Sequence, residues 1–355
     1  MRRIARYLAL PLLAVVVFLV LGEILARAAN IVDRLNGYNR ALFTHGPNED
    51  VPYVLRPRVE TTFLGTAVRV NSLGFRGAEV APVPEPGVRR VLILGDSVAF
   101  GFGVDEDAML SSAVARHLGE AGGGRYEVIN AGIPGADLLA SVRLLETSGL
   151  ALGPQAAVLA VSLNDYDPTP ALNPLGILTR NRPGTDASGV LDRSEIALLL
   201  RWLLAYSRGA LPFQLEERRG QEHWDAQRLE RGGDGLARIV ERTHLRFYHD
   251  PEPAQWDRVR KAVAALGRIA AAGRVQVLVA IFPEQYQLSR ANPDLTPQQR
   301  LLGLCQEEKL RCVDLWHEFA AAGETSYADV QHPNADGYAL AGNAIAAALL
   351  APASP

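Results

Sequence analysis

The chain has 355 residues, 48% of them hydrophobic, and a formal net charge of −3 at pH 7. A chain of this length buries a large core, and one domain with additions fits it better than two equal domains. The slight negative charge gives no electrostatic basis for binding nucleic acid.

The amino terminus carries an export or anchoring segment. Arg2, Arg3 and Arg6 precede a mostly apolar, uncharged run from Tyr7 to Gly22. Positive charge ahead of an apolar helix keeps that end in the cytoplasm, so the rest of the chain is expected to be exported. As a helix the run is about 24 Å long, slightly shorter than the ~30 Å hydrocarbon core of a bilayer.

Two interpretations remain open for residues 1–32. Ala26-Arg27-Ala28 can serve as the cleavage site of a secretory signal peptide, which would release the protein. Alternatively the helix continues through Glu23 to about Val32 as an uncleaved signal-anchor, with Glu23 and Arg27 paired at i, i+4. The run is longer than the usual signal-peptide core, which favours a membrane anchor with the remaining domain in the periplasm or outside the cell.

Residues 33–87 form an extension ahead of the main domain. Val59–Val70 alternates loosely around Leu64-Gly65-Thr66, which predicts a hairpin, and Ala81–Gly87 has the Pro-rich composition of a linker. Between them, Arg76 has two interpretations: it holds an anionic or sugar group of a substrate, or it is a structural arginine. The structural role is the one we favour.

From residue 88 onwards, apolar runs alternate with helical patterns. The apolar runs predict strands at Arg90–Leu94, Tyr126–Asn130, Ala156–Ser162, Val275–Phe282 and Arg311–Leu315. Helices are predicted at Asp107–Glu120, Asp137–Ser148, Ala254–Ala272 and Thr296–Glu308. This alternation indicates βαβ crossovers and a parallel sheet that is covered on both faces.

The first predicted strand ends in Gly95-Asp96-Ser97. In an open α/β sheet, the loops at the carboxyl ends of the strands bind the ligand. A serine placed there, in a turn with a glycine that has no side chain, is exposed and open to a substrate, as a nucleophile must be. The same turn is also compatible with a phosphate site or a simple helix cap.

A matching base lies near the other end of the chain, in Asp329-Val330-Gln331-His332-Pro333-Asn334. A serine hydroxyl needs a base to remove its proton, and histidine titrates in the right range. Asp329, three residues before His332, can fold back to orient the imidazole, so Ser97, His332 and Asp329 form a workable triad. The alternative is a helix N-cap region with an exposed histidine and aspartate.

Two further loops follow predicted strands and supply candidate oxyanion donors. They are Asn130-Ala131-Gly132-Ile133-Pro134-Gly135 and Ser162-Leu163-Asn164-Asp165. Gly135 can bring a backbone N–H close, Asn164 can supply a side-chain NH₂, and Ser97 can add its own backbone N–H. A turn glycine and a loop cap are the structural alternatives for Gly135 and Asn164.

These four segments, in this order, resemble the SGNH (GDSL-like) hydrolase family, over roughly residues 88–350. The resemblance implies a flavodoxin-like three-layer α/β/α sandwich with a central parallel sheet of about five strands. It further implies Ser97 as nucleophile, His332 as base, Asp329 as orienting acid, and Ser97, Gly135 and Asn164 as the oxyanion hole. Asp96 and Arg76 are weaker substrate-binding candidates. One departure is visible, because Ser162 stands where the family's third segment usually has glycine, and we expect only a small shift in loop packing.

An insert of about residues 166–253 follows the third predicted strand, where it can form a lid or a substrate wall. It contains an apolar helix candidate, Ile196–Tyr206, which is too short to span a membrane. This helix either packs on the core or forms a lipid- or acyl-contacting surface, and we favour packing on the core.

The two cysteines, Cys305 and Cys312, are either a disulfide, which export permits, or two buried thiols. No cluster of cysteine and histidine indicates a metal. The first turn lacks G-x-G-x-x-G, so no dinucleotide or other cofactor is expected.

The function predicted from the sequence is a serine esterase, or acylhydrolase, that forms an acyl-enzyme. Its expected substrate is an ester on an envelope or exported carbohydrate or lipid, and its second partner is the membrane. An O-acetyltransferase with the same triad, which passes the acyl group to a sugar hydroxyl, is the alternative. A non-catalytic carbohydrate-binding module is less favoured, because it predicts a broken triad.

Overall fold

The computed structural model describes residues 2–29, 31, 40–63, 65–172, 178–179, 194–207 and 235–352. The chain divides into two compact units. The helical unit consists of Met1–Arg40 and Ala171–Gly220, and the sheet unit consists of Ala41–Pro170 and Gln221–Pro355. Leu64 of the predicted hairpin, Val32 at the predicted anchor's end and most of the predicted insert lie outside the described residues.

A five-stranded parallel sheet forms the centre of the sheet unit, in the order β11-β10-β7-β5-β6. Its strands are β5 (Val88–Gly95), β6 (Arg125–Gly132), β7 (Ala156–Val161), β10 (Gln276–Ile281) and β11 (Arg311–Asp314). The five strands predicted from apolar runs are therefore confirmed. β7 is buried along its whole length because both faces of the sheet are covered.

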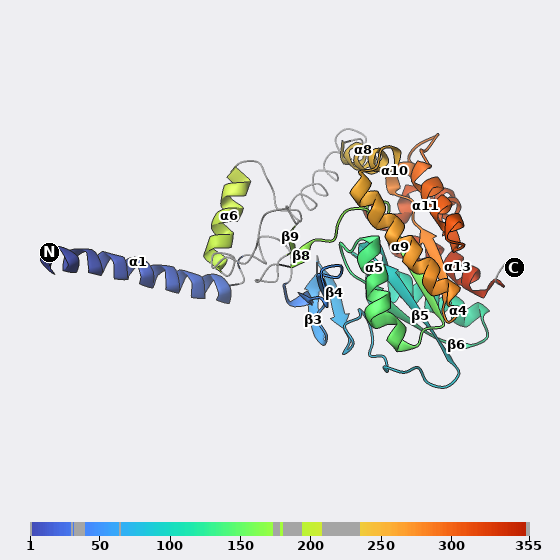
Figure 1. The fold of residues 1–355 in the computed structure, drawn as a ribbon, viewed down its shortest axis with the longest axis horizontal. Coiled ribbons are helices and arrows are strands. Elements are labelled where there is room, and N and C mark those ends of the chain that lie inside the picture. Colours follow the sequence, from blue (N-terminus) through green and yellow to red (C-terminus); the bar gives the residue numbers. More distant parts are fainter. Residues whose placement is uncertain are drawn as a thin grey trace. The chain divides into compact units, whose positions relative to one another are not determined.

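Helices cover both faces of this sheet (Figure 1). The helices of the sheet unit are α3 (Ser97–Phe100), α4 (Leu110–Ala121), α5 (Leu138–Leu144), α8 (Gly235–His249), α9 (Pro253–Ala271), α10 (Gln285–Leu288), α11 (Thr296–Glu307), α12 (Trp316–Ala322) and α13 (Ala335–Leu350). On one face, α4 and α13 pack on alternate residues of β5 and β7 through side chains such as Leu110, Val114 and Ile345. On the other face lie α5 and α9. The three layers are those of the predicted α/β/α sandwich.

The predicted extension is attached to the sheet unit. Its hairpin is β3 (Val59–Phe63) paired with β4 (Thr66–Val70), preceded by a second hairpin of β1 (Phe43–His45) and β2 (Tyr53–Leu55). The Pro-rich stretch is held by Arg90 of β5, whose fully buried guanidinium donates to the carbonyls of Ala81 and Pro82 at 2.7 and 3.1 Å. The stretch is thus fixed against the sheet at this point.

The helical unit contains α1 (Arg2–Ala28), α6 (Glu195–Ser207) and a short hairpin of β8 (Ala171–Leu172) and β9 (Leu178–Thr179). Within α1, Pro11–Ala28 is long and apolar enough to cross a membrane. The favoured interpretation of the apolar helix in the insert, packing on the core, is wrong: α6 belongs to the unit of α1 and exposes Leu200, Leu203 and Leu204.

The two cysteines form a disulfide, Cys305–Cys312. It joins the last turns of α11 to β11, the edge strand of the sheet. The sequence left a disulfide and two buried thiols as alternatives, and the structure contains the disulfide.

Candidate active site

Ser97 lies at the carboxyl end of the central strand β5, as the first residue of the short helix α3. The turn between them depends on Gly95, which has φ +143° and lies so close to the carbonyl of Ala160 that a Cβ would clash with it. Asp96 caps α3, because its carboxylate accepts the N–H of Val98 at 2.8 Å. This sharp turn leaves the Ser97 side chain partly exposed while its neighbours are buried.

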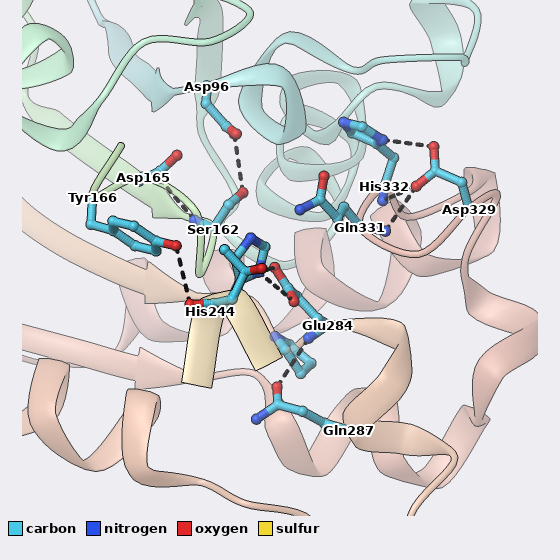
Figure 2. A network of polar contacts seen from close by, with 12 residues as sticks. Asp96, Ser162, Asp165, Tyr166, His244, Glu284, Gln287, Asp329, Gln331 and His332 are labelled. Carbon is cyan, nitrogen blue, oxygen red and sulfur yellow. Dashed lines mark hydrogen bonds and ion pairs between the residues drawn. The ribbon is translucent and has the colours of Figure 1, made fainter. Parts of the chain in front are cut away.

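Ser97 and His332 are 235 residues apart in the sequence and are hydrogen-bonded in the structure, with 2.9 Å between Ser97 Oγ and His332 Nε2. On the other side of the ring, 2.7 Å separates His332 Nδ1 from Asp329 Oδ2 (Figure 2). The other oxygen of Asp329 accepts the backbone N–H groups of Gln331 and His332 at 2.8 and 2.7 Å. The three residues predicted as a triad therefore form one continuous chain of hydrogen bonds.

The imidazole of His332 is fixed by packing as well as by its hydrogen bonds. The ring of Phe102 stacks on it, with 4.1 Å between the centroids and 17° between the planes. His332 and Asp329 are both buried. Burial opposes the charge of Asp329, but the adjacent His332 and the two backbone N–H donors outweigh it and hold the carboxyl pKa below its usual value. The carboxylate is thus ready to stabilise an imidazolium.

Asp96 connects the turn that carries Ser97 to the loop after β7. Its carboxylate accepts Ser162 Oγ at 3.1 Å, and Ser97 Oγ lies 3.2 Å from its second oxygen (Figure 2 shows Asp96 and Ser162). Asp165 adds a second acid here, and its pKa is raised well above the usual value by burial, by the charge of Asp96 and by a hydrogen bond with it. Asp96 therefore supports the loops around Ser97, and Ser162 is a hydrogen-bonding part of that support instead of the usual glycine.

Gly135 and Asn164 lie at the same edge of the sheet as Ser97, because they follow β6 and β7, the two strands that flank β5. Gly135 has φ +78° and is exposed. Asn164 belongs to a tight turn in which its carbonyl accepts the N–H of Asp167 at 3.0 Å. The Oδ1 atom of Asn164 is buried and has no hydrogen-bond partner among the described residues.

Arg76 is buried beneath α3, the helix that begins at Ser97. Its guanidinium donates to the carbonyls of Phe100, Gly101 and Val104 at 3.0, 2.6 and 2.8 Å, and it lies 4.6 Å from the centroid of the Phe100 ring. Burial lowers its pKa to about 10. These contacts support the structural role that the sequence favoured for Arg76, since its donors hold the segment that carries α3.

A second histidine–carboxylate pair lies near His332 and Asp329, and no sequence pattern predicts it. His244 of α8 and Glu284, which follows β10, are both buried, with 2.7 Å between Nδ1 and Oε1 (Figure 2). The ring of Tyr166 packs with its edge against His244 and stacks on Phe247 at 3.7 Å. On the other side, the N–H of Gln285 donates to Val330 at 3.2 Å. The pair thus joins the Asn164 turn to the loop of Asp329 and His332.

Replacing His244 with Gln is expected to destabilise the protein in a pH-dependent way. Although burial disfavours its charge, Glu284 and Asp167 raise the pKa of His244. A raised pKa stabilises the fold fully below the unfolded value of about 6.5, and this contribution is lost as the pH rises through the folded value. Losing one partner of a buried pair costs about 3 kcal/mol, so melting followed by circular dichroism should show a Tm roughly 6–10 °C lower at pH 6. A smaller decrease is expected at pH 9.

The matched control is His249→Gln. His249 lies on the same helix and pairs with Asp294 at 2.6 Å, but more than half of its side chain is exposed. Exposed pairs add little to stability, so this variant should melt close to the wild type at both pH values. Equal Tm losses for His244→Gln at pH 6 and pH 9 would contradict a charged His244–Glu284 pair.

A groove of about 550 Å³ begins at the turn that carries Asn164. Tyr166 and Asp167 of that turn form one wall, and α8 with the loop leading into α9 forms the rest. Its donors and acceptors include Asp167, Thr243, Arg246, Asp250, Glu252 and Gln255. Within the described parts of the chain, no group of three or more His, Cys, Asp or Glu side chains is placed to hold a metal ion.

Solved esterases and lipolytic proteins resemble this chain at low sequence identity and low TM-scores. The crystal structure of TesA is 15% identical, with a TM-score of 0.42 over 74% of this chain and 98% of that one. An acetyl xylan esterase, AlAXEase, is 14% identical, with a TM-score of 0.41 over 73% and 99%. A putative lipolytic protein of the G-D-S-L family from Desulfitobacterium hafniense DCB-2 is 12% identical, with a TM-score of 0.39 over 74% and 99%. No curated protein matches the sequence.

Residues 93–340 match the sequence model of the GDSL-like lipase/acylhydrolase family. The matched region begins within β5 and ends within α13, so it contains the whole sheet edge with Ser97, Asn164 and His332. It spans more than half of the chain. The protein is therefore a member of the GDSL-like lipase/acylhydrolase family and a hydrolase of ester bonds.

Proposed function

We propose that the protein is a serine esterase in which Ser97 is the nucleophile, His332 the general base and Asp329 the residue that orients it. The observation that carries this proposal is the unbroken chain of hydrogen bonds from Ser97 Oγ through His332 to Asp329, at 2.9 and 2.7 Å. A nucleophile and base within hydrogen-bond reach, with the base oriented by a third group, is the arrangement that acyl transfer requires.

The reaction proceeds in two halves. Ser97 Oγ attacks the ester carbonyl while His332 Nε2 accepts its proton, and the imidazolium then protonates the departing alcohol, which leaves an acyl-enzyme. Water attacks the acyl-enzyme in the same way, giving its proton to His332, and Ser97 is regenerated with release of the acid. Backbone N–H groups of Ser97 and Gly135 and the Asn164 amide are the proposed donors to the oxyanion.

The groove beside the Asn164 turn favours a carbohydrate ester over a long-chain lipid ester. A sugar presents hydroxyl groups that need both donors and acceptors, and the groove supplies guanidinium, amide, hydroxyl and carboxylate groups. An acyl chain gains from apolar walls, and charged groups along its path would have to be desolvated. The sugar portion of the substrate is therefore proposed to lie here.

The apolar helix of the helical unit supports a location at the membrane. We propose that Pro11–Ala28 of α1 stays in the membrane as an uncleaved anchor, with the sheet unit outside the cytoplasm. An enzyme tethered in this way acts on esters of the cell envelope or of exported polysaccharide.

The same triad serves an O-acetyltransferase, in which a sugar hydroxyl replaces water in the second half-reaction. The test is release of acetate from a short-chain chromogenic acetate by the full chain in detergent, with and without an oligosaccharide acceptor. Release that depends on Ser97 and does not change with the acceptor supports the esterase. Acetyl groups appearing on the oligosaccharide support the transferase, and an absence of covalent labelling by a serine-reactive probe would overturn both.

A further inference from the structure

The charged residue Glu23 lies within the apolar stretch of α1 and has an unexpected set of partners. Its carboxylate accepts hydrogen bonds from Ser194 Oγ at 2.9 Å and from the backbone N–H groups of Glu195 and Ile196 at 2.9 and 3.1 Å. Arg27 donates to the same carboxylate at 2.7 Å. An acidic side chain inside a membrane-length helix marks a specific role, and here its role is to cap the first turn of α6.

Side chains accept three of the N–H groups in the first turn of α6. A helix leaves its first N–H groups without intrahelical partners, and water satisfies them when the end is exposed. In α6, Glu23 satisfies two of them, and Ser194 Oγ accepts a third from Ala197 at 3.1 Å. In a hydrocarbon environment each unsatisfied group would cost several kcal/mol. Side chains thus take the place of water at the α6 N-terminus, as is needed where water is scarce.

The side chain of Ile196 in α6 also packs against α1 beside this cap. A Cβ added at Gly22 would lie 3.0 Å from Cδ1 of Ile196. Glycine at this position thus leaves room for the Ile196 side chain, one residue before the carboxylate that caps α6. Cap and contact together fix α6 on the carboxyl-terminal part of α1.

The outward side of α6 is apolar. Leu200, Leu203 and Leu204 are spaced i, i+3, i+4 and are 55%, 46% and 54% exposed. Outside α1 and α6, the large hydrophobic side chains exposed in the described parts of the chain are only Val83 and Leu150. Exposed apolar surface is thus concentrated on these two helices. Such a large apolar surface is typical of a region that contacts a membrane or another protein.

We propose that α6 is a second membrane-contacting element, which lies in the outer interface of the lipid bilayer with Leu200, Leu203 and Leu204 in the hydrocarbon. This rests on the proposed anchoring by α1, whose exposed apolar surface continues onto α6. With its 13 residues, α6 is only about 20 Å long and cannot cross the ~30 Å hydrocarbon core. α6 therefore contacts the bilayer without crossing it.

Nitroxide labels at single introduced cysteines test this in the full chain, reconstituted in vesicles of phosphatidylcholine and phosphatidylglycerol. Labels replace Leu203 in α6, Leu19 in α1 and Leu150, an exposed leucine of the sheet unit. The measured quantity is the ratio of each label's collision rate with dissolved oxygen to its collision rate with a water-soluble nickel complex. A high oxygen-to-nickel collision ratio means that the label lies in lipid. The proposal expects the Leu203 and Leu19 labels in lipid and the Leu150 label in water.

The outcomes separate this proposal from the proposed anchor. A Leu203 label in water with the Leu19 label in lipid overturns the role of α6 and leaves the anchor intact. Both labels in water overturn both. A Leu203 label shielded from both reagents, with dipolar coupling between labels, means that a second copy of the chain covers α6, which also overturns the lipid contact.

A capping variant tests the role of Glu23. In Glu23→Ala, the α6 N–H groups lose their acceptor, so the oxygen-to-nickel collision ratio at Leu203 should fall toward that of the Leu150 label. The matched control is Arg27→Gln, which removes a partner of Glu23 and leaves the cap, and should keep the wild-type ratio. Acetate hydrolysis in detergent should be unchanged in both, which shows that the sheet unit is folded. An unchanged collision ratio in Glu23→Ala contradicts the capping role.

Discussion

Ser97→Ala and His332→Ala are each expected to reduce kcat for acetate hydrolysis on the order of 10⁶-fold, leaving only the residual catalysis of the oxyanion donors and of substrate binding. Without Ser97, the three hydrogen-bonded residues have no hydroxyl that can form an acyl ester. Without His332, the Ser97 hydroxyl, which lies 2.9 Å from His332 Nε2, keeps its proton and does not attack. Because nucleophile and base act as a unit, the double variant should be no slower than either single one. Hydrolysis of a chromogenic acetate by the full chain in detergent measures this.

Ser162→Ala is the matched control for Ser97→Ala. Its hydroxyl lies at the same sheet edge and also bonds to Asp96, at 3.1 Å, but no proton transfer is assigned to it. This variant should keep most of the activity and should still react with a covalent serine probe, which Ser97→Ala should not do. Activity retained in Ser97→Ala, with an unchanged melting temperature, would place the nucleophile elsewhere.

The sheet and its flanking helices could be predicted because their signal is local. Strands buried on both faces read as short apolar runs, as in Ala156–Val161, and the helices between them repeat every three to four residues. The positions of Ser97, Gly135, Asn164 and His332 at one edge follow from the parallel topology, since every one of them comes directly after a strand or in the loop before α13. Pattern and topology placed these residues together, whereas their roles as nucleophile, base and oxyanion donors came from the family resemblance and stay predictions.

The supporting contacts could not be predicted, because they join residues far apart in the sequence. Phe102 stacks on His332 across 230 positions, and nothing in its surroundings distinguishes it from a core phenylalanine. His244 and Glu284 are charged residues whose burial only the tertiary structure establishes. In the same way, Glu23 could be paired with Arg27 from their spacing, but its bonds to Ser194 and Glu195 depend on how the insert folds.

The Asp329→Asn variant is expected to lose activity on the order of 10⁴-fold, a smaller loss than that caused by removing His332. Asp329 Oδ2 lies 2.7 Å from His332 Nδ1 and so keeps the proton on that nitrogen, which leaves Nε2 free to accept the proton of Ser97. An asparagine amide can donate to Nδ1 instead, which places the proton on Nε2, where it blocks the base. Its carbonyl oxygen can still accept the N–H groups of Gln331 and His332, so the loop should keep its shape.

The pH dependence of this variant distinguishes a charged Asp329 from a merely well-packed one. The pKa of Asp329 is depressed in the folded state, so its carboxylate adds stability above the unfolded value near 3.8, and that stability is lost as the pH falls through the folded value. The difference in Tm between wild type and Asp329→Asn should therefore be largest near neutral pH and should shrink below about pH 4. Because removing the charge also removes the partner of the imidazolium, the loss of activity and the loss of stability at pH 7 should appear together. A variant that melts like the wild type at pH 7 and yet loses 10⁴-fold in rate would instead assign Asp329 to orientation of the ring alone.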